Sequence, residues 1–152
     1  YVCDVAKWHA IMQAYENGGH AYHATMPTDG LVTFRDAIAE TREFGFENAR
    51  QAQIELGKRM RALMQEHGFA SVAAEGFQAP SVIVSFTDDA DMKSGKKFMQ
   101  QGVQIAAGVP LQVGEGDEYM SFRIGLFGLD KLMNIDRTVS LFEQALGKVE
   151  SA

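Results

Sequence analysis

The chain has 152 residues, of which 46% are apolar and 22% charged, a balance typical of a globular domain with one substantial core. Its net charge of −6, without any basic run, argues against a nucleic-acid or acidic-membrane partner. A single cysteine, Cys3, excludes an internal disulfide and favours a reducing, cytoplasmic setting. No apolar run approaches the length of a membrane span, and no signal peptide is evident.

The first part of the chain predicts a short helix followed by an extended segment. Apolar residues recur at helical spacing between residues 5 and 15, and Asn17 with two glycines ends that pattern. Residues 20–27 end in Pro27, which favours an extended backbone before it. The chain begins at Tyr1, within this structured pattern and without an initiating methionine, so we expect a piece of a longer protein.

Two amphipathic helices are predicted next. The first covers residues 28–44, begins with hydroxyl and carboxylate residues that can cap its free amides, and is closed by Gly45. The second covers residues 47–67, has a continuous apolar stripe, and is closed by Gly68. Together they lead into the more varied second half of the chain.

The second half predicts the element order β-β-α-β-β-α. Its strands are short and often linked as hairpins, which favours an α+β fold: a small, mainly antiparallel sheet with helices packed on one face, preceded by two helices. The expected strands are residues 70–74, 81–86, 103–107 and 119–128. The expected helices are residues 90–101 and a last helix that is capped by Asp130 or Asn134, runs to Leu146 and is closed by Gly147.

The last expected strand carries the most informative side chain, Arg123. Phe122 and Ile124 share a core face, so Arg123 points to the opposite face, between the small residues Ser121 and Gly125. Small neighbours leave room for a ligand, and a planar guanidinium suits a carboxylate or phosphate held by two parallel hydrogen bonds. The structural alternative is an ion pair with a distant Asp or Glu.

Other candidate side chains have structural explanations. His20 and His23 lack a neighbouring cysteine or acidic ligand, so no metal site is predicted. Cys3 is not interpreted as a nucleophile. The three lysines of the helix expected at residues 90–101 are interpreted as a solvated face and not as a binding patch.

Two motifs, at residues 22–31 and 122–128, carry a resemblance to a known family. The first is Tyr-His-Ala-Thr-Met-Pro-Thr-Asp-Gly-Leu, and the second is Phe-Arg-Ile-Gly-Leu-Phe-Gly. With the long helix between them, they make the chain resemble the C-terminal part of class V aminotransferases over residues 1–148. The chain is most similar to the alanine–glyoxylate and serine–pyruvate type, which carries pyridoxal phosphate on a fold-type-I scaffold.

The resemblance implies roles for three residues. Arg123 matches the arginine that holds the substrate α-carboxylate. Tyr22 and Thr25 match hydroxyl residues that reach the cofactor phosphate of the neighbouring subunit, which implies a homodimer. The implied reaction moves an amino group from a small amino acid, such as alanine or serine, to a 2-oxo acid, such as glyoxylate or pyruvate. Residues 106–118 depart from the family's glycine-rich pattern and are longer, which leaves the substrate open.

The resemblance assigns no catalytic residue to this chain. The family's Schiff-base lysine lies before the matched part, so the chain alone is expected to be inactive. By the same resemblance, residues 1–45 are the tail of the large cofactor domain with the subunit-contact segment, residues 46–68 a connecting helix, and residues 69–149 the small α+β domain. Two alternatives stay open: another class V substrate such as 2-aminoethylphosphonate, and a non-catalytic α+β module that dimerises or binds an anion through Arg123.

Overall fold

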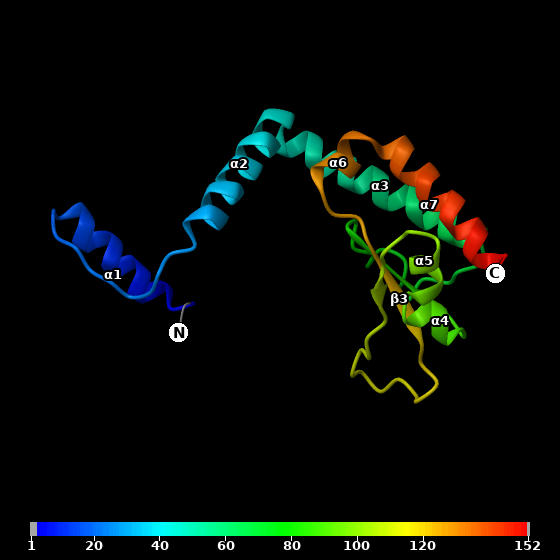
Figure 1. The fold of residues 1–152 in the computed structure, drawn as a ribbon. Helices are drawn as coiled ribbons and strands as arrows, with labels where there is room; N and C mark the ends of the chain where they lie inside the picture. Colours follow the sequence, from blue (N-terminus) through cyan, green and yellow to red (C-terminus); the bar gives the residue numbers. More distant parts are fainter. Residues whose placement is uncertain (1–2, 152) are drawn as a thin grey trace. The chain divides into compact units, whose positions relative to one another are not determined.

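The structure is a computed structural model that describes residues 3–151 (Figure 1). The sequence predicts regular structure from the first residue of the chain. The first two residues of that segment, Tyr1 and Val2, lie outside the described residues. The chain forms two compact units, Tyr1–Glu40 and Thr41–Ala152. Within the described residues, no helix is long and apolar enough to cross a membrane.

The first unit contains the predicted short helix and extended segment. Helix α1 spans Val5–Glu16, and its N-cap Asp4 accepts a hydrogen bond from the backbone N–H of Lys7 at 2.9 Å. The segment between α1 and α2 has neither helix nor strand, as expected. Helix α2 spans Thr28–Phe44, and most of its large apolar residues are exposed: Leu31, Val32, Phe34 and Ile38. The boundary between the units falls within α2.

Helix α3 spans Phe46–Glu66 and supplies one side of the core of the second unit. Gly45, with φ of 99°, stands between α2 and α3, in a conformation that favours glycine. The apolar stripe predicted for α3 is buried, with Leu56 and Met60 almost inaccessible to solvent. Each such side chain contributes about 1.5–3 kcal/mol through burial.

Three strands form an antiparallel sheet in the order β1-β3-β2. Strand β1 spans Val82–Phe86, β2 spans Ala106–Ala107, and β3 spans Ser121–Gly125. The central strand, β3, pairs with both neighbours: Ile83 lies opposite Ile124, and Ala106 opposite Arg123. As predicted, the face that carries Ile124 is buried in the core.

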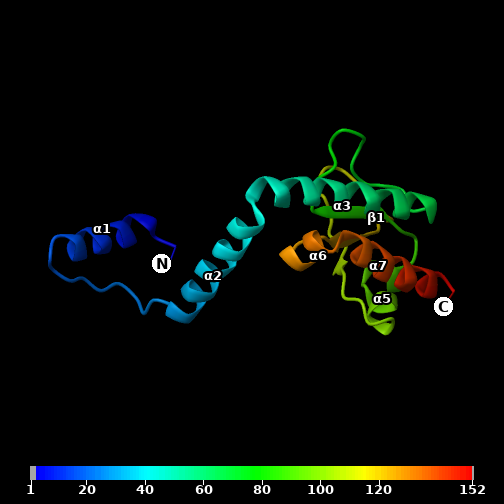
Figure 2. The same ribbon diagram turned by 90° about the horizontal axis from the view of Figure 1, so that it is seen from above.

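Helices cover this buried face of the sheet. Helix α7 (Ile135–Glu150) follows the short helix α6 (Leu129–Met133) and packs beside α3 on the same side of the sheet (Figures 1 and 2). Helices α4 (Ala90–Lys93) and α5 (Lys96–Gln100) complete the layer, where the Phe98 ring stacks on Phe142 at 5.9 Å between centroids. The α+β fold predicted from the sequence is confirmed.

Several element boundaries predicted from the sequence are wrong. Residues 70–74 form only an isolated bridge, between Ser71 and Ser85, with flanking hydrogen bonds from Val72 N–H to the Val84 carbonyl and from Phe86 N–H to the Ala70 carbonyl. The helix expected at residues 90–101 breaks at Gly95, whose φ of 79° is incompatible with an α-helix. Gly147 does not end the last helix, which continues to Glu150.

The two predicted strands around the loop are also shorter than expected. The strand at residues 103–107 is reduced to Ala106–Ala107, and the strand at residues 119–128 to Ser121–Gly125. Hydrogen bonding to partner strands defines these limits, and the alternation of apolar residues alone extends beyond them.

Candidate functional site

Arg123 lies in the middle of the central strand, on the face turned away from the core. Its Cα partners are Val84 on β1 and Ala106 on β2. Its Nε donates a hydrogen bond to the carbonyl oxygen of Ala107 at 2.9 Å, which orients the guanidinium. Among the described residues, no Asp or Glu forms an ion pair with Arg123. The terminal nitrogens of the guanidinium are therefore available to an external anion.

The neighbours of Arg123 on this face are small and closely packed. Ser121 is 1% exposed, and its Oγ accepts a hydrogen bond from the Tyr119 hydroxyl at 3.0 Å. A Cβ at Gly108 would collide with the backbone carbonyl of Ser121, so only glycine allows the two backbones to approach this closely. Gly125, on the other side of Arg123, is exposed. The ring of Phe127 lies beside Gly125 on that flank.

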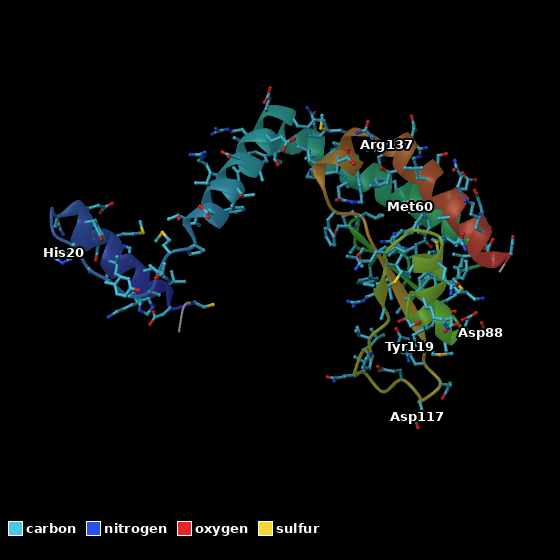
Figure 3. All side chains as sticks on the ribbon, in the orientation of Figure 1. His20, Met60, Asp88, Asp117, Tyr119 and Arg137 are labelled. Carbon is cyan, nitrogen blue, oxygen red and sulfur yellow. The ribbon has the colours of Figure 1, made fainter. Side chains whose placement is uncertain are left out.

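A cavity of about 420 Å³ lies beside this strand. Its wall consists of residues from the loop at 108–117, together with Lys93, Tyr119 and Ser121. Figure 3 places Tyr119 where this loop rejoins the sheet and Asp117 at its far tip. Because Ser121 and Arg123 are two residues apart on one face of β3, the cavity begins about 7 Å along the strand from Arg123.

The loop is held together by Glu115. Its carboxylate accepts hydrogen bonds from the backbone N–H groups of Val113 at 2.9 Å and Gln112 at 2.8 Å, and from that of Leu111. The N–H of Val113 and its neighbours lower the pKa of Glu115 from 4.5 to about 2. Gln112 has φ of 60°, which aims these N–H groups at a common point. The sequence analysis did not predict that Glu115 binds these N–H groups, although the position of Glu115 between Gly114 and Gly116 was a local signal of a tight loop.

Tyr22 and Thr25 lie in the first unit, in the extended segment before α2. The two side-chain oxygens, Tyr22 Oη and Thr25 Oγ1, are 3.2 Å apart and hydrogen-bonded. The Tyr22 side chain is 77% exposed, so both hydroxyls are accessible. The structure thus brings these two predicted site residues together. Arg123 belongs to the second unit.

The three lysines interpreted as one solvated face are not equivalent. Lys96 Nζ pairs with Asp91 at 2.9 Å, and Lys97 Nζ pairs with Asp89 at 2.8 Å and lowers the pKa of that carboxyl. Lys93 is half-buried, lines the cavity, and pairs with no acidic side chain among the described residues. The spacing of the three lysines along the sequence did not indicate this difference, because sequence position alone does not show which lysine faces the loop.

Within residues 3–151 no three His, Cys, Asp or Glu side chains are grouped closely enough to hold a metal ion. His23 instead packs its ring edge-on against Trp8, with 5.2 Å between centroids.

Comparison with known proteins places this fold. No protein-family model matches the sequence, and no curated protein matches it. Among solved structures, the chain is similar to an aminotransferase, the alanine–glyoxylate aminotransferase from Nostoc sp., with a TM-score of 0.68. The likeness covers 93% of this chain at 17% sequence identity, and 38% of that chain. The chain therefore has an aminotransferase-like fold and spans well under half the length of that neighbour.

Proposed function

We propose that this chain is the C-terminal part of a class V, pyridoxal-phosphate-dependent aminotransferase. The single observation that carries the proposal is the guanidinium of Arg123, oriented by the Ala107 carbonyl and without an acidic partner among the described residues. Such a group is suited to fixing a carboxylate by two parallel hydrogen bonds. The likeness of the fold to an aminotransferase supports the same conclusion.

In this proposal, Arg123 holds the α-carboxylate of a small amino acid and of the 2-oxo acid that accepts its amino group. The hydrogen bond from Nε to Ala107 limits rotation of the side chain, so the carboxylate meets a preoriented pair of N–H donors. Alanine or serine as donor, and glyoxylate or pyruvate as acceptor, are the substrates proposed. 2-Aminoethylphosphonate is the alternative, because a phosphonate accepts the same two hydrogen bonds.

The hydroxyls of Tyr22 and Thr25 fit the phosphate of pyridoxal phosphate. They are exposed, adjacent, and able to donate to anionic oxygens once their mutual hydrogen bond is exchanged. When bound, this cofactor supplies the electron-withdrawing π-system that labilises the bonds of the amino acid's α-carbon. We propose that the two hydroxyls serve a cofactor held mainly by the neighbouring subunit, and hence that the active protein is a cytoplasmic homodimer.

The proposal also divides the chain by role. Residues 1–45 are the tail of a large cofactor domain with the subunit-contact segment, residues 46–68 are a connecting helix, and residues 69–149 are the small domain. No residue of this chain is proposed to carry out the proton transfers. These belong to a lysine in the preceding part of the full-length enzyme, so the chain alone would not transaminate.

The first test is the intact mass of the protein in extract from its source cells, detected with an antibody against α7. A species much larger than 16.7 kDa is expected, and it must contain a lysine that binds pyridoxal phosphate covalently. A species of 16.7 kDa would contradict the aminotransferase activity.

A non-catalytic module is the second candidate, and one observation favours it. The residues of Thr41–Ala152 bury a core of their own, from α3, the sheet and α7, so this unit has the packing of an independent domain. In that case Arg123 would bind an anion without chemistry. A protein of 16.7 kDa that binds carboxylates through Arg123 would establish this alternative.

A further inference from the structure

The cavity beside strand β3 is lined by the cation Lys93, to which neither the fold nor the proposed function gives a role. We propose that Lys93 binds a second anionic group of the substrate, so that the preferred substrate, in place of alanine or serine, is a dianion: an acidic amino acid and its dicarboxylic 2-oxo acid, or a phosphono analogue. This inference rests on the proposed function, because it takes Arg123 as the site of the first carboxylate.

The first argument is that Lys93, unlike the neighbouring lysines, has no ion-pair partner among the described residues. Lys96 and Lys97 are each neutralised by an aspartate at 2.9 and 2.8 Å. Lys93 lies on the preceding turn, is half-buried, and has no acidic partner among the described residues. A partly desolvated ammonium without a counter-ion is costly, and an anionic ligand in the cavity would offset that cost.

The second argument is a structural connection between the two cations. Arg123 Nε donates to the carbonyl oxygen of Ala107, and the N–H of Gly108 donates to the carbonyl oxygen of Lys93 at 3.2 Å. The Ala107 carbonyl and the Gly108 N–H belong to one peptide unit. A single rigid plane therefore bridges Arg123 and the end of α4, which fixes the spacing of the two residues.

The third argument is the lining of the cavity beside Lys93. Ser121 supplies a hydroxyl that can donate to an anionic oxygen, whereas the Tyr119 hydroxyl already donates to Ser121 Oγ. The nearby carboxylate of Glu115 is already engaged by backbone N–H groups. Asp117 is exposed at the tip of the loop, where it also lines the cavity (Figure 3). Among the described residues that line the cavity, Lys93 is the one cationic side chain.

The test measures binding of unreactive anions to the full-length protein by calorimetry at pH 7. Glutarate and 3-phosphonopropionate are the dianionic probes, and butyrate is the monoanionic probe. Lys93→Met is expected to weaken both dianions at least about tenfold and to leave butyrate unchanged, because only the second charge–charge contact is lost. The dianion that binds more tightly to the unmodified protein identifies the second group as carboxylate or phosphonate.

Three further variants make the result specific. Lys93→Arg keeps the charge and is expected to retain most dianion affinity, which also shows that the site tolerates substitution. Lys96→Met removes a neighbouring lysine that is already paired and should change no affinity. Asp117→Asn should not weaken the dianions. Thermal unfolding of each variant confirms that it is folded.

Failure of this inference can be distinguished from failure of the proposed function. If Arg123→Lys weakens all three probes while Lys93→Met weakens none, the second subsite is wrong and the role of Arg123 stands. If Arg123→Lys leaves all three affinities unchanged, the assignment of Arg123 is wrong, and the inference fails with it.

Discussion

At the scale of single residues, the site depends on how each polar side chain is partnered. Arg123 is oriented by one backbone carbonyl, Lys93 faces a cavity, and Glu115 is fully engaged by its own loop. The same residue types elsewhere in the chain form ordinary surface ion pairs, such as Arg59 with Asp136. These differences in partnering, and not the residue types themselves, single out the candidate site.

Replacing Arg123 by lysine in the full-length enzyme is expected to raise the KM for the amino donor by at least about tenfold. A single ammonium cannot make the two parallel hydrogen bonds of a guanidinium, so the carboxylate is bound more weakly and its orientation is less restricted. Steady-state kinetics with alanine and serine measure the effect. Arg59→Lys, at an exposed ion pair, is the matched control and should leave KM unchanged. Equal KM values for both variants would contradict the assignment.

Removing one hydroxyl, by Tyr22→Phe, is expected to weaken retention of pyridoxal phosphate roughly tenfold, since one charge-assisted hydrogen bond to the phosphate is lost. Cofactor release during dialysis, followed by absorbance, measures this. Tyr15→Phe removes the hydroxyl of an exposed tyrosine on α1 and should not alter retention. If both variants keep the cofactor as well as the unmodified enzyme, Tyr22 has no role in phosphate binding.

Glu115 predicts a pH dependence of loop order. Its pKa is about 2 in the folded protein, against 4.5 without the backbone contacts, so the folded loop prefers the ionised carboxylate. The stabilisation is complete above pH 4.5 and is lost as the pH falls from 4.5 towards 2. Hydrogen exchange at the amides of Leu111, Gln112 and Val113 should therefore show less protection, relative to amides of α3, as the pH falls through this window.

A Glu115→Gln variant tests the same mechanism at neutral pH. The amide side chain cannot carry the negative charge that the three N–H groups bind, so protection at residues 111–113 should already be low at pH 7. Glu118→Gln, on the same loop, is the control. Unchanged protection in Glu115→Gln would show that the loop does not depend on this carboxylate.

At the scale of elements, close approach between α3 and the entry to β1 depends on one glycine. A Cβ at Gly57 would collide with the backbone of Pro80, which also accepts a hydrogen bond from Gln53 Nε2 at 3.1 Å. Arg61, four positions after Gly57 on α3, donates to the Ala79 and Val82 carbonyls and fixes the same segment. The helix therefore positions the strand through backbone contacts.

Gly57→Ala is expected to lower the free energy of unfolding by about 1–3 kcal/mol, although alanine favours a helix more than glycine does, because overpacking against a fixed backbone outweighs propensity. Gly147→Ala in α7 is the matched control. A Cβ there meets no atom within 4 Å, so the substitution should stabilise by about 0.5–1 kcal/mol. Urea unfolding compares the two, and a stabilising Gly57→Ala would contradict the close approach.

At the scale of the whole molecule, the two units differ in how they bury apolar residues. The second unit has a continuous core of helices and sheet. Among the described residues of the first unit, Ile11 is the one buried apolar side chain, whereas Leu31, Phe34 and Ile38 on α2 are between 41% and 63% exposed. Exposed apolar residues at helical spacing form a surface suited to packing against another protein surface.

The isolated 152-residue chain is therefore expected to self-associate. Sedimentation velocity should show species larger than the 16.7 kDa monomer, and replacing Leu31, Phe34 and Ile38 together by serine should shift the distribution to the monomer. Replacing exposed Phe77, Val113 and Phe127 in the second unit by serine is the control and should not do so. A monomeric unmodified chain would show that α2 needs no covering partner.

Much of the fold was determined by the sequence itself, because local periodicity and turn residues act within a few positions. The buried stripe of α3, the glycines at 45 and 68, and the opposite faces of Phe122 and Arg123 all follow from neighbouring residues. The α+β class follows from their order. The roles of Tyr22, Thr25 and Arg123 came from resemblance, and they stay predictions that the experiments above address.

Only the tertiary structure decided the features that depend on residues far apart in the chain. The strand order β1-β3-β2, the position of Gly57 against Pro80, and the peptide unit between Lys93 and Arg123 are contacts of this kind. The contrast between Lys93 and Lys96 is another. Three-dimensional packing determines which side chain finds a partner, and the spacing of residues along the chain does not contain that information.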